Sequence, residues 1–246
     1  MILGNIFYPR KSFLEPDEKD VLISVQDDIQ VGVRLFLVDK EWPTILYFHG
    51  NAELAQEYDS IASMYNNFQL NIIVADYRGY GLSGGTPNKN NLHEDAIKIF
   101  DYLSDYLKHE KYHLPLVVMG RSLGSASVSE IISKREESIG KCIIESGFAT
   151  EYPLLRLMNI NPKEINYSLE DGFGNLSKLK KFKKPLYIIH ADMDDIIPFS
   201  EAELIIKESE SNQKDLLRVS GANHNNIIAT INKLYFQKIK DFIYSK

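Results

Sequence analysis

A serine flanked by glycines is the residue of this sequence best placed to act as a nucleophile. Residues 120–124 read Gly-Arg-Ser-Leu-Gly, which fits the pattern G-x-S-x-G. The pattern directly follows the apolar run 116–119 and directly precedes a segment of helical character. A sharp strand-to-helix turn strains its serine and needs small neighbours, because the backbone passes close by on both sides. These features favour Ser122 as a nucleophile over a serine that only caps a helix.

A serine hydroxyl is a poor nucleophile at neutral pH, so it needs a general base, and the base needs an acid to orient it. For a serine at a strand-to-helix turn, the expected order along the chain is serine, acid, histidine. Two histidines follow Ser122: His190 ends an apolar run, and His224 lies in the polar loop Ser-Gly-Ala-Asn-His-Asn. Loops beyond strand ends commonly display catalytic groups, so His224 is the predicted base.

The acid is expected between Ser122 and His224 in the chain. The segment His-Ala-Asp-Met-Asp-Asp-Ile-Ile-Pro at residues 190–198 offers three aspartates. Asp192, Asp194 and Asp195 all have the required chemistry. Each of them could instead cap the helix that is expected near Pro198. The residue types alone leave this choice open.

The elements that must position these residues alternate between short apolar runs and helical segments. Several runs are apolar at every position, which is typical of a parallel sheet covered by helices on both faces. The first two runs lie close together with Asp27 and Asp28 between them, which predicts an antiparallel hairpin at one edge. Helices are expected over 93–106, 122–135 and 227–243, and the chain predicts a single three-layer α/β domain over 1–246. The predicted strands are 21–25, 31–38, 44–48, 71–75, 116–119, 141–144, 186–190 and 216–219.

Residues 146–184 break this alternation with Pro153, Pro162, Gly172 and Gly174 and with one short apolar stretch at 154–158. We expect either a short lid-like insertion or the connecting helix between two strands. Met158 and its apolar neighbours could line a pocket there, although ordinary core packing is the simpler explanation.

Composition excludes several classes of protein. The 246 residues are 44% hydrophobic, and 28 Lys and Arg against 34 Asp and Glu give a net charge of −6, which disfavours nucleic-acid binding. The one cysteine, Cys142, makes no internal disulfide and no zinc site alone, so a reducing cytoplasm suits the chain. No apolar run approaches the ~20 residues of a membrane span. The N-terminus lacks the features of a signal peptide.

Three further motifs make the sequence resemble the α/β-hydrolase superfamily over nearly its whole length. Residues 47–52, Tyr-Phe-His-Gly-Asn-Ala, match the loop that members use for the oxyanion hole, and residues 76–83 match their next loop. Residues 221–225 match Gly-Ala-Gly-His-Asn, with Asn223 in place of a glycine. The resemblance implies an eight-stranded, mostly parallel sheet with a short or absent lid. It is greatest to the lidless depalmitoylase and thioesterase-like branch, whose N-terminal lipidated cysteines have no counterpart here.

The same resemblance chooses among the aspartates. Members often carry His-Gly-x-x-Asp-x-x-Val/Ile-Pro, and aligning His190 and Pro198 with this pattern implies Asp194 as the acid, with Asp192 as the second choice. Ala191 replaces the glycine of the pattern.

Two backbone N–H groups are expected to stabilise the negative charge that acyl transfer builds on the carbonyl oxygen. The first belongs to Leu123, the residue after the nucleophile. The resemblance implies that the second belongs to Asn51, while His49 is expected to hold the loop rather than to act as a base.

The predicted function is that of a serine hydrolase that cleaves carboxylic esters or acyl thioesters through an acyl-enzyme. A serine peptidase or amidase of the same fold is the first alternative, and a non-catalytic ligand-binding protein is the second. No metal-ligand spacing and no phosphate-binding glycine loop occurs, so no cofactor is predicted. The substrate is expected to be a small molecule or an acyl group, and the oligomeric state does not follow from the sequence.

The remaining candidates have simple structural explanations. Arg121 could orient a substrate carboxylate or phosphate, or pair with an acid at the protein's own surface. Five lysines between Lys178 and Lys184 form either a solvated face or a weak peripheral contact with anionic headgroups. His93, His109 and His113 are expected at the surface.

Overall fold

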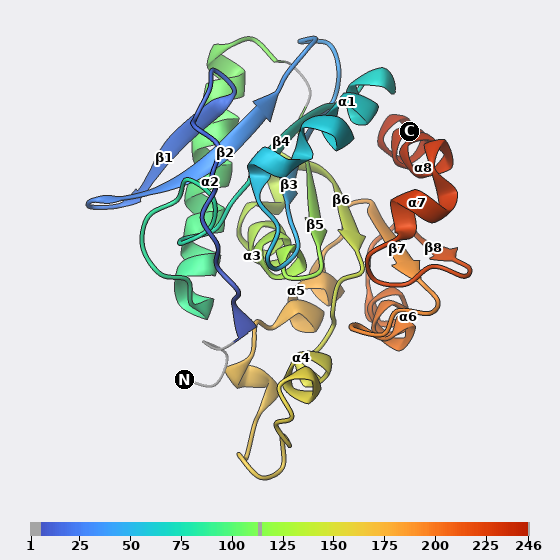
Figure 1. The fold of residues 1–246 in the computed structure, drawn as a ribbon. Helices are drawn as coiled ribbons and strands as arrows, with labels where there is room; N and C mark the ends of the chain where they lie inside the picture. Colours follow the sequence, from blue (N-terminus) through green and yellow to red (C-terminus); the bar gives the residue numbers. More distant parts are fainter. Residues whose placement is uncertain (1–5, 113–114, 246) are drawn as a thin grey trace.

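The computed structural model describes residues 6–112 and 115–245, so His113 and the first five residues of the N-terminus lie outside the described residues. Within these ranges, one sheet of eight strands has the order β1-β2-β4-β3-β5-β6-β7-β8 (Figure 1). The strands are β1 (Asp20–Gln26), β2 (Ile29–Phe36), β3 (Thr44–Phe48), β4 (Asn71–Ala75), β5 (Leu116–Arg121), β6 (Ile139–Glu145), β7 (Leu186–Ala191) and β8 (Lys214–Val219).

Strand direction in this sheet is mixed only at one edge. β1 pairs with β2 and β2 pairs with β4 in the antiparallel sense, which confirms the predicted hairpin. From β4 to β8 every pairing is parallel. The carboxyl ends of these parallel strands therefore meet at one edge of the sheet, where loops can bring distant residues together.

Helices cover both faces of the sheet, as the continuously apolar strands predict. Along β3, Leu46 and Phe48 belong to the core that the sheet forms with α2, α3, α5 and α6, whereas Ile45 and Tyr47 belong to the core formed with α1, α7 and α8. The helices are α1 (Asp59–Asn67), α2 (Lys89–His109), α3 (Gly124–Arg135), α4 (Tyr152–Leu157), α5 (Asn175–Lys181), α6 (Phe199–Glu208), α7 (Ile227–Ile231) and α8 (Lys233–Tyr244).

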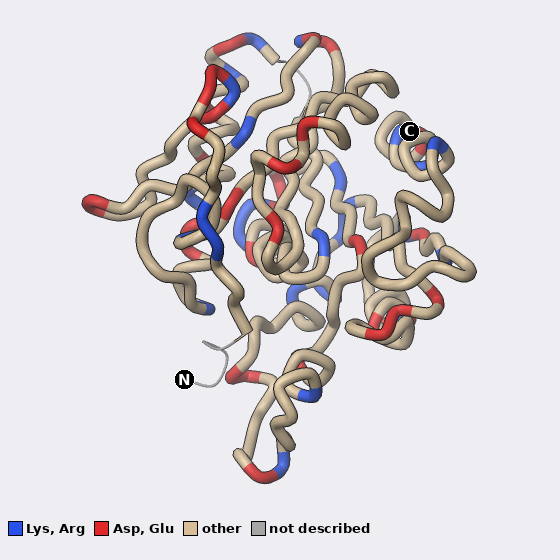
Figure 2. The backbone as a smooth tube through the Cα atoms, in the orientation of Figure 1, with Lys and Arg blue, Asp and Glu red and all other residues tan. Residues whose placement is uncertain are grey.

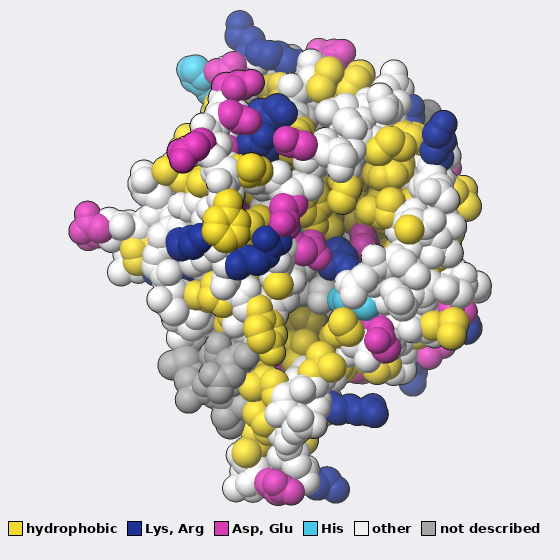
Figure 3. All heavy atoms as spheres, in the orientation of Figure 1, with side chains coloured by type: hydrophobic (Ala, Val, Ile, Leu, Met, Phe, Trp, Pro, Cys, Tyr) yellow, Lys and Arg dark blue, Asp and Glu magenta, His cyan; other side chains and the backbone are white. Residues whose placement is uncertain are grey.

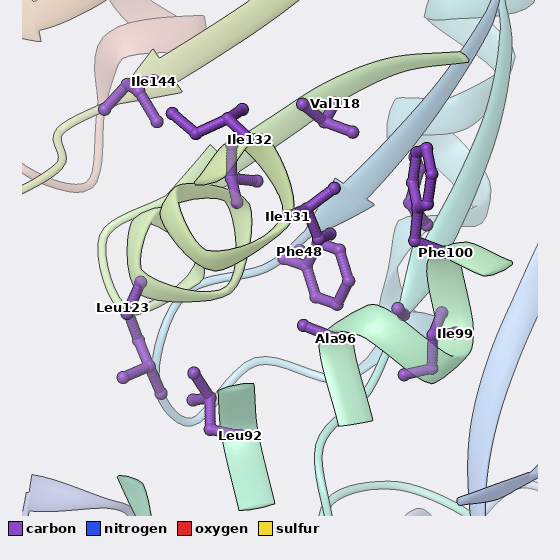
Figure 4. Packing of buried hydrophobic residues seen from close by; sticks show 14 of the residues in the cluster. Phe48, Leu92, Ala96, Ile99, Phe100, Val118, Leu123, Ile131, Ile132 and Ile144 are labelled. Carbon is purple, nitrogen blue, oxygen red and sulfur yellow. The ribbon is translucent and has the colours of Figure 1, made fainter. Parts of the chain in front are cut away.

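The first of these cores fixes the helix that follows the G-x-S-x-G turn. Phe48, Ala96, Phe100 and Ile131 lie close together between β3, α2 and α3 (Figure 4). None of these four side chains is more than 1% exposed. Burying a large apolar side chain of this kind stabilises a fold by roughly 1.5–3 kcal/mol. The packing therefore holds α3 firmly against the sheet.

The C-terminal helix expected over 227–243 is wrong as a single helix. The chain forms α7 and α8 instead, with Asn232 between them at a φ of 48°. With a ψ of −126° this residue lies outside the helical region, so α7 ends and α8 begins there.

The second strand begins and ends two residues before the predicted 31–38, because β2 spans Ile29–Phe36. The side-chain oxygen of Asn71 accepts the N–H of Val38 at 2.8 Å and the N–H of Asp39 at 3.3 Å. A side chain thus takes the place of the neighbouring strand, and Val38 is left 62% exposed.

The segment 146–184 divides into two parts. Its second part, α5, belongs to the helical layer, where Leu179 is fully buried in the core shared with α3. Its first part contains α4 and the short 3-10 turn Leu169–Asp171, and Figure 1 shows it extending away from the sheet.

No helix in the described ranges 6–112 and 115–245 is long and apolar enough to cross a membrane.

Candidate active site

Ser122 occupies a tight turn between β5 and α3, at the carboxyl edge of the sheet. Its φ of 49° lies in the left-handed region, which is rare for a residue other than glycine. A Cβ on Gly124 would lie 2.0 Å from the carbonyl oxygen of Phe48, and one on Gly120 would lie 2.4 Å from that of Gly124. Both glycines are therefore required by close backbone packing, and the turn presents Ser122 at the start of α3.

His224 lies within hydrogen-bond reach of this serine. Its Nε2 is 3.1 Å from the hydroxyl oxygen of Ser122, and its Nδ1 is 2.8 Å from Oδ2 of Asp194. A carboxylate only accepts hydrogen bonds, so the ring proton is assigned to Nδ1 and leaves Nε2 free to accept the serine proton. The three residues come from the ends of β5, β7 and β8, and all are at least nine-tenths buried. The structure thus brings together the three residues predicted as a triad.

Of the three candidate aspartates, only Asp194 reaches the imidazole. Asp192 instead accepts the N–H of Gly221 at 2.8 Å, and Asp195 is exposed to solvent. The conformation of the loop after β7 decides between them, because a second oxygen of Asp194 accepts the N–H of Ile197 at 2.7 Å and so turns the carboxylate inward.

The environment of Asp194 keeps its carboxylate charged. Burial opposes ionisation, but the hydrogen bonds from His224 and from the N–H of Ile197 outweigh it and lower the pKa of Asp194 below its usual range. His190 lies nearby, with Nε2 2.8 Å from the carbonyl oxygen of Ile197. Burial lowers the pKa of His190, so this ring is neutral and donates to that carbonyl. It supports the acid-bearing loop and does not contact Ser122.

Two backbone N–H groups near Ser122, those of Asn51 and Leu123, were predicted to bind an oxyanion. Among the described residues, no carbonyl or side chain accepts the N–H of Asn51 or of Leu123. Both residues adjoin Ser122: Leu123 follows it in the chain, and Asn51 lines the same pocket. Free N–H groups beside a nucleophile are well suited to bind a developing oxyanion.

The side chain of Asn51 has a second task that the sequence did not indicate. Its oxygen accepts the N–H of Tyr8 at 3.0 Å and the hydroxyl of Tyr80 at 2.6 Å, and its nitrogen donates to the carbonyl of Ile6. Residues 6–8, the N-terminal segment, are thereby fixed to residues 49–53, which we call the oxyanion loop.

His49 supports the same loop by hydrogen bonds, as expected. Its Nε2 is 2.9 Å from Oδ1 of Asp76, its Nδ1 is 2.7 Å from the carbonyl oxygen of Gly50, and the side chain is fully buried. Burial opposes protonation of this ring, but the hydrogen bond with Asp76 outweighs it, so the pKa of His49 is raised. It makes no contact with Ser122.

A pocket of about 360 Å³ opens beside the serine. Figure 3 shows the molecule hollowed near the middle of this face, with hydrophobic side chains along the edges of the hollow. One wall comes from α4 and its C-terminal end, so these residues of segment 146–184 line the pocket, and Leu154 and Met158 also pack against the core. The apolar lining consists of Ile6, Tyr8, Leu154, Leu157, Met158 and Ile196.

Arg121 pairs with acids, but within the site and not at the protein surface. Its side chain is 13% exposed, and it forms an ion pair with Glu53 and lies 3.4 Å from Glu145. Sequence reasoning missed both glutamates. The signal for Glu53 was its place just after the oxyanion motif, whereas Glu145 ends a strand and was hidden in an apolar run.

The lysines between Lys178 and Lys184 are largely engaged with the protein itself, and Figure 2 shows blue segments at α5 and red segments at the neighbouring α6. Lys178 contacts Glu130 at 2.6 Å, Lys180 contacts Glu208 at 3.0 Å, and Lys184 donates to two backbone carbonyls. These contacts do not favour a free basic patch.

The prediction that His93 is a surface residue is wrong. Its side chain is 16% exposed and stacks edge-on against Phe173, with Lys178 and Glu130 beside it. Burial and the positive charge of Lys178 lower the pKa of His93 to about 4, so the ring is neutral at pH 7. His109, in contrast, is 86% exposed as predicted.

No group of three or more His, Cys, Asp or Glu residues in the described ranges is arranged to hold a metal ion.

Comparison with known proteins places the chain in a family. Residues 40–165, just over half of the chain, match the Hydrolase_4 family, which is described as serine aminopeptidase, S33. Protein bem46 of Schizosaccharomyces pombe is 26% identical over 204 residues, which cover 82% of this chain and 67% of that protein. Alpha/beta hydrolase domain-containing protein 17B of Xenopus laevis is 28% identical over 203 residues, 81% of this chain and 66% of that one.

Among solved structures, an esterase of Pyrococcus furiosus superposes with a TM-score of 0.75 at 19% identity, covering 96% of this chain and 97% of that one. This likeness shows the fold, and it agrees with the sheet order and the helical layers described above. From the fold and the family match together, the chain belongs to the Hydrolase_4 family of α/β-hydrolases, described as serine aminopeptidase, S33.

Proposed function

We propose that the protein is a serine hydrolase that cleaves carboxylic esters or acyl thioesters, with Ser122, His224 and Asp194 as its catalytic triad. The observation that carries this proposal is the continuous hydrogen-bonded chain from the serine hydroxyl through the imidazole to the carboxylate, with contacts of 3.1 and 2.8 Å. Nucleophile and base within this distance, and a base oriented by a third group, are the geometric signature of an activated serine.

In the proposed reaction, Ser122 attacks the acyl carbonyl carbon while its proton passes to Nε2 of His224. The N–H groups of Asn51 and Leu123 stabilise the oxyanion of the tetrahedral intermediate. The C–O or C–S bond of the leaving group then breaks, and His224 returns the proton to the departing alcohol or thiol. Water repeats these steps on the acyl-enzyme, which releases the carboxylic acid and restores the serine.

The lining of the pocket supports an apolar acyl group as the part of the substrate bound beside Ser122. Aliphatic side chains of α4 and of the N-terminal segment face this space, and apolar pockets bind ligands mainly by removing apolar surface from water. In this proposal the first part of segment 146–184 acts as a fixed side wall of the acyl site.

An amide or peptide substrate is the second candidate, and the family description as a serine aminopeptidase favours it. An aminopeptidase needs a carboxylate for the free amine of its substrate, and Glu53 lines the pocket. That carboxylate, however, is already paired with Arg121 and accepts the hydroxyl of Tyr58. We therefore rank ester and thioester cleavage first.

The experiment that tests the proposal is hydrolysis of matched p-nitrophenyl esters, acyl thioesters and aminoacyl p-nitroanilides, from acetyl to palmitoyl where the series allows. Wild type is compared with Ser122→Ala at equal concentrations of folded protein. Ser122-dependent turnover of esters or thioesters is the expected result. Turnover confined to the anilides would replace the proposal by its alternative, and activity unchanged in Ser122→Ala would refute the triad.

A further inference from the structure

Arg121, the residue directly before the nucleophile, makes contacts with the loop that carries the base. Its Nη2 donates to the carbonyl oxygen of His224 at 2.8 Å and to Oδ1 of Asn225 at 3.0 Å. The contact to His224 is made to its main chain, so the guanidinium fixes the backbone from which the imidazole projects. A shift of that backbone would change the distance between Nε2 and Ser122 directly.

The other side of the same guanidinium contacts the oxyanion loop. Its Nη1 pairs with Oε1 of Glu53, whose other oxygen accepts the N–H of Gly50 at 3.2 Å. Gly50 directly precedes Asn51, one of the two proposed oxyanion donors. A Cβ on Gly50 would lie 2.4 Å from Nη1 of Arg121, so the ion pair packs directly on the loop and a larger residue there would displace it. One side chain therefore connects the nucleophile turn, the base loop and the oxyanion loop.

The charges around Arg121 show that this connection is built into the interior. Burial opposes protonation of the guanidinium, but Glu53 and Glu145 outweigh it, and the pKa of Arg121 is raised. Burial likewise opposes ionisation of Glu53, but the positive charge of Arg121 outweighs it and lowers the pKa of Glu53. Burial raises the pKa of Glu145, whose carboxylate also accepts the hydroxyl of Tyr235. A buried cation with these partners is stable only while its partners stay in place, so the contacts are coupled.

We propose that Arg121 is a positioning residue for the triad. Its guanidinium links the main-chain carbonyl of His224 to the carboxylate of Glu53 and so sets the distance between His224 and Ser122. This inference rests on the proposed function, because it assigns Arg121 a role in the same reaction. It differs from substrate binding, because the protein's own groups already occupy the guanidinium: Nη1 pairs with Glu53, Nη2 donates to His224 and Asn225, and Nε lies 3.4 Å from Glu145.

The shape of the side chain accounts for arginine at this position. A planar guanidinium directs donors along fixed lines to a carboxylate on one side and to a carbonyl on the other. A lysine ammonium is a single point charge and reaches one of these partners at a time. Arg121→Lys is therefore expected to keep the charge and restore only part of the positioning.

A second cavity makes the role testable by chemical rescue. A pocket of about 480 Å³ lies on the other side of the base loop and is lined by Arg121, Glu53, Glu145 and His224. Guanidinium ions can reach this space from solvent. They should therefore replace the missing group when the side chain is shortened to alanine.

The experiment compares Arg121→Met, Arg121→Lys and Arg121→Ala with wild type on the best ester substrate. Arg135→Met is the matched control, because Arg135 pairs with Asp101 on the surface, where the two side chains are 38% and 44% exposed. Misplacement of a catalytic group by about 1 Å costs on the order of 10²-fold in rate. We expect kcat of Arg121→Met to fall by about that factor with KM little changed, Arg121→Lys to lie between, and Arg135→Met to match wild type. Low millimolar guanidinium should raise kcat of Arg121→Ala but not of wild type, and urea should have no effect.

A spectroscopic measurement keeps the inference testable apart from turnover. The proton shared by His224 and Asp194 should give a far-downfield NMR resonance in wild type and Arg135→Met, and that resonance should shift or vanish in Arg121→Met. An unchanged resonance together with an unchanged kcat would overturn the inference. The inference would also be overturned if Arg121→Met lost activity through unfolding with a raised KM and guanidinium did not rescue Arg121→Ala. A wild-type protein without Ser122-dependent activity would instead overturn the proposed function, and the resonance would still report whether Arg121 sets the geometry of His224.

Discussion

Replacing Asp194 by asparagine tests the proposed orientation of the base with the smallest change in shape. In the structure, Oδ2 of Asp194 is 2.8 Å from Nδ1 of His224, and Oδ1 accepts the N–H groups of Ile196 at 3.0 Å and of Ile197 at 2.7 Å. Asparagine keeps the oxygen that the two N–H groups require. Its NH2 group then faces Nδ1, which must become an acceptor, so the ring proton moves to Nε2. A ring protonated at Nε2 cannot accept the serine proton.

The expected loss can be estimated from this tautomer argument. In serine–histidine–aspartate triads, the change from aspartate to asparagine lowers kcat about 10⁴-fold. Each tenfold change in rate corresponds to about 1.4 kcal/mol, so the loss is about 5 kcal/mol of transition-state stabilisation. Acid stability should change as well: the lowered pKa of Asp194 means that its carboxylate stabilises the fold above its ordinary pKa of 3.8, and that this contribution is lost as the pH falls through the folded value.

The assay is kcat on the best ester for Asp194→Asn, with Asp192→Asn as the matched control. Asp192 lies in the same loop but accepts the N–H of Gly221 and contacts Arg218, so its replacement should leave kcat within about threefold of wild type. The reasoning is refuted if Asp194→Asn retains wild-type kcat in folded protein, or if Asp192→Asn loses activity instead.

Three further results are expected. Gly124→Ala should destabilise the protein by about 1–3 kcal/mol or more in urea unfolding, because the added Cβ would lie 2.0 Å from a backbone oxygen of β3. In the control Gly84→Ala the added Cβ would lie 3.7 Å from its nearest atom, so stability should change by less than about 0.5 kcal/mol. The pKa of His93 falls from 6.5 to about 4 on folding, so the neutral ring contributes its full share to the free energy of unfolding above pH 6.5. At pH 5 the free energy of unfolding should be lower by about 2 kcal/mol. Urea unfolding of His93→Gln above pH 6.5 and at pH 5 should show a smaller loss. Met158→Trp should shift the preferred acyl chain of the esters towards shorter lengths by filling the pocket, while Leu169→Trp, which lines a different hollow, should leave the preference unchanged.

The sequence predicts the sheet well because several of its parallel strands contain continuous apolar runs and its turns carry clear signals. The strands over 44–48 and 71–75 have the predicted bounds. The departures occur at single polar residues. Asn71 ends β2 from a neighbouring strand, and Asn232 divides the last helix. The effect of Asn71 does not follow from local propensity, because it depends on what the side chain meets in the folded chain.

For the site, the residue types and their order along the chain predict Ser122 and His224, whereas only the family resemblance chose Asp194 among the three aspartates after β7. The partners of Arg121 could not be predicted, since the sequence does not show that Glu53 and Glu145 meet at one guanidinium. Charged residues in a soluble chain usually lie at the surface, and only the meeting of three loops makes this buried cluster stable.

Covalent labelling tests the central claim most directly. A fluorophosphonate reacts with a serine only when that serine is activated as a nucleophile, and digestion followed by mass spectrometry identifies the modified residue. We predict labelling of wild type at Ser122, and strongly reduced labelling of folded His224→Ala. Folded wild-type protein that stays unlabelled, or that carries the label on another residue, would contradict the account.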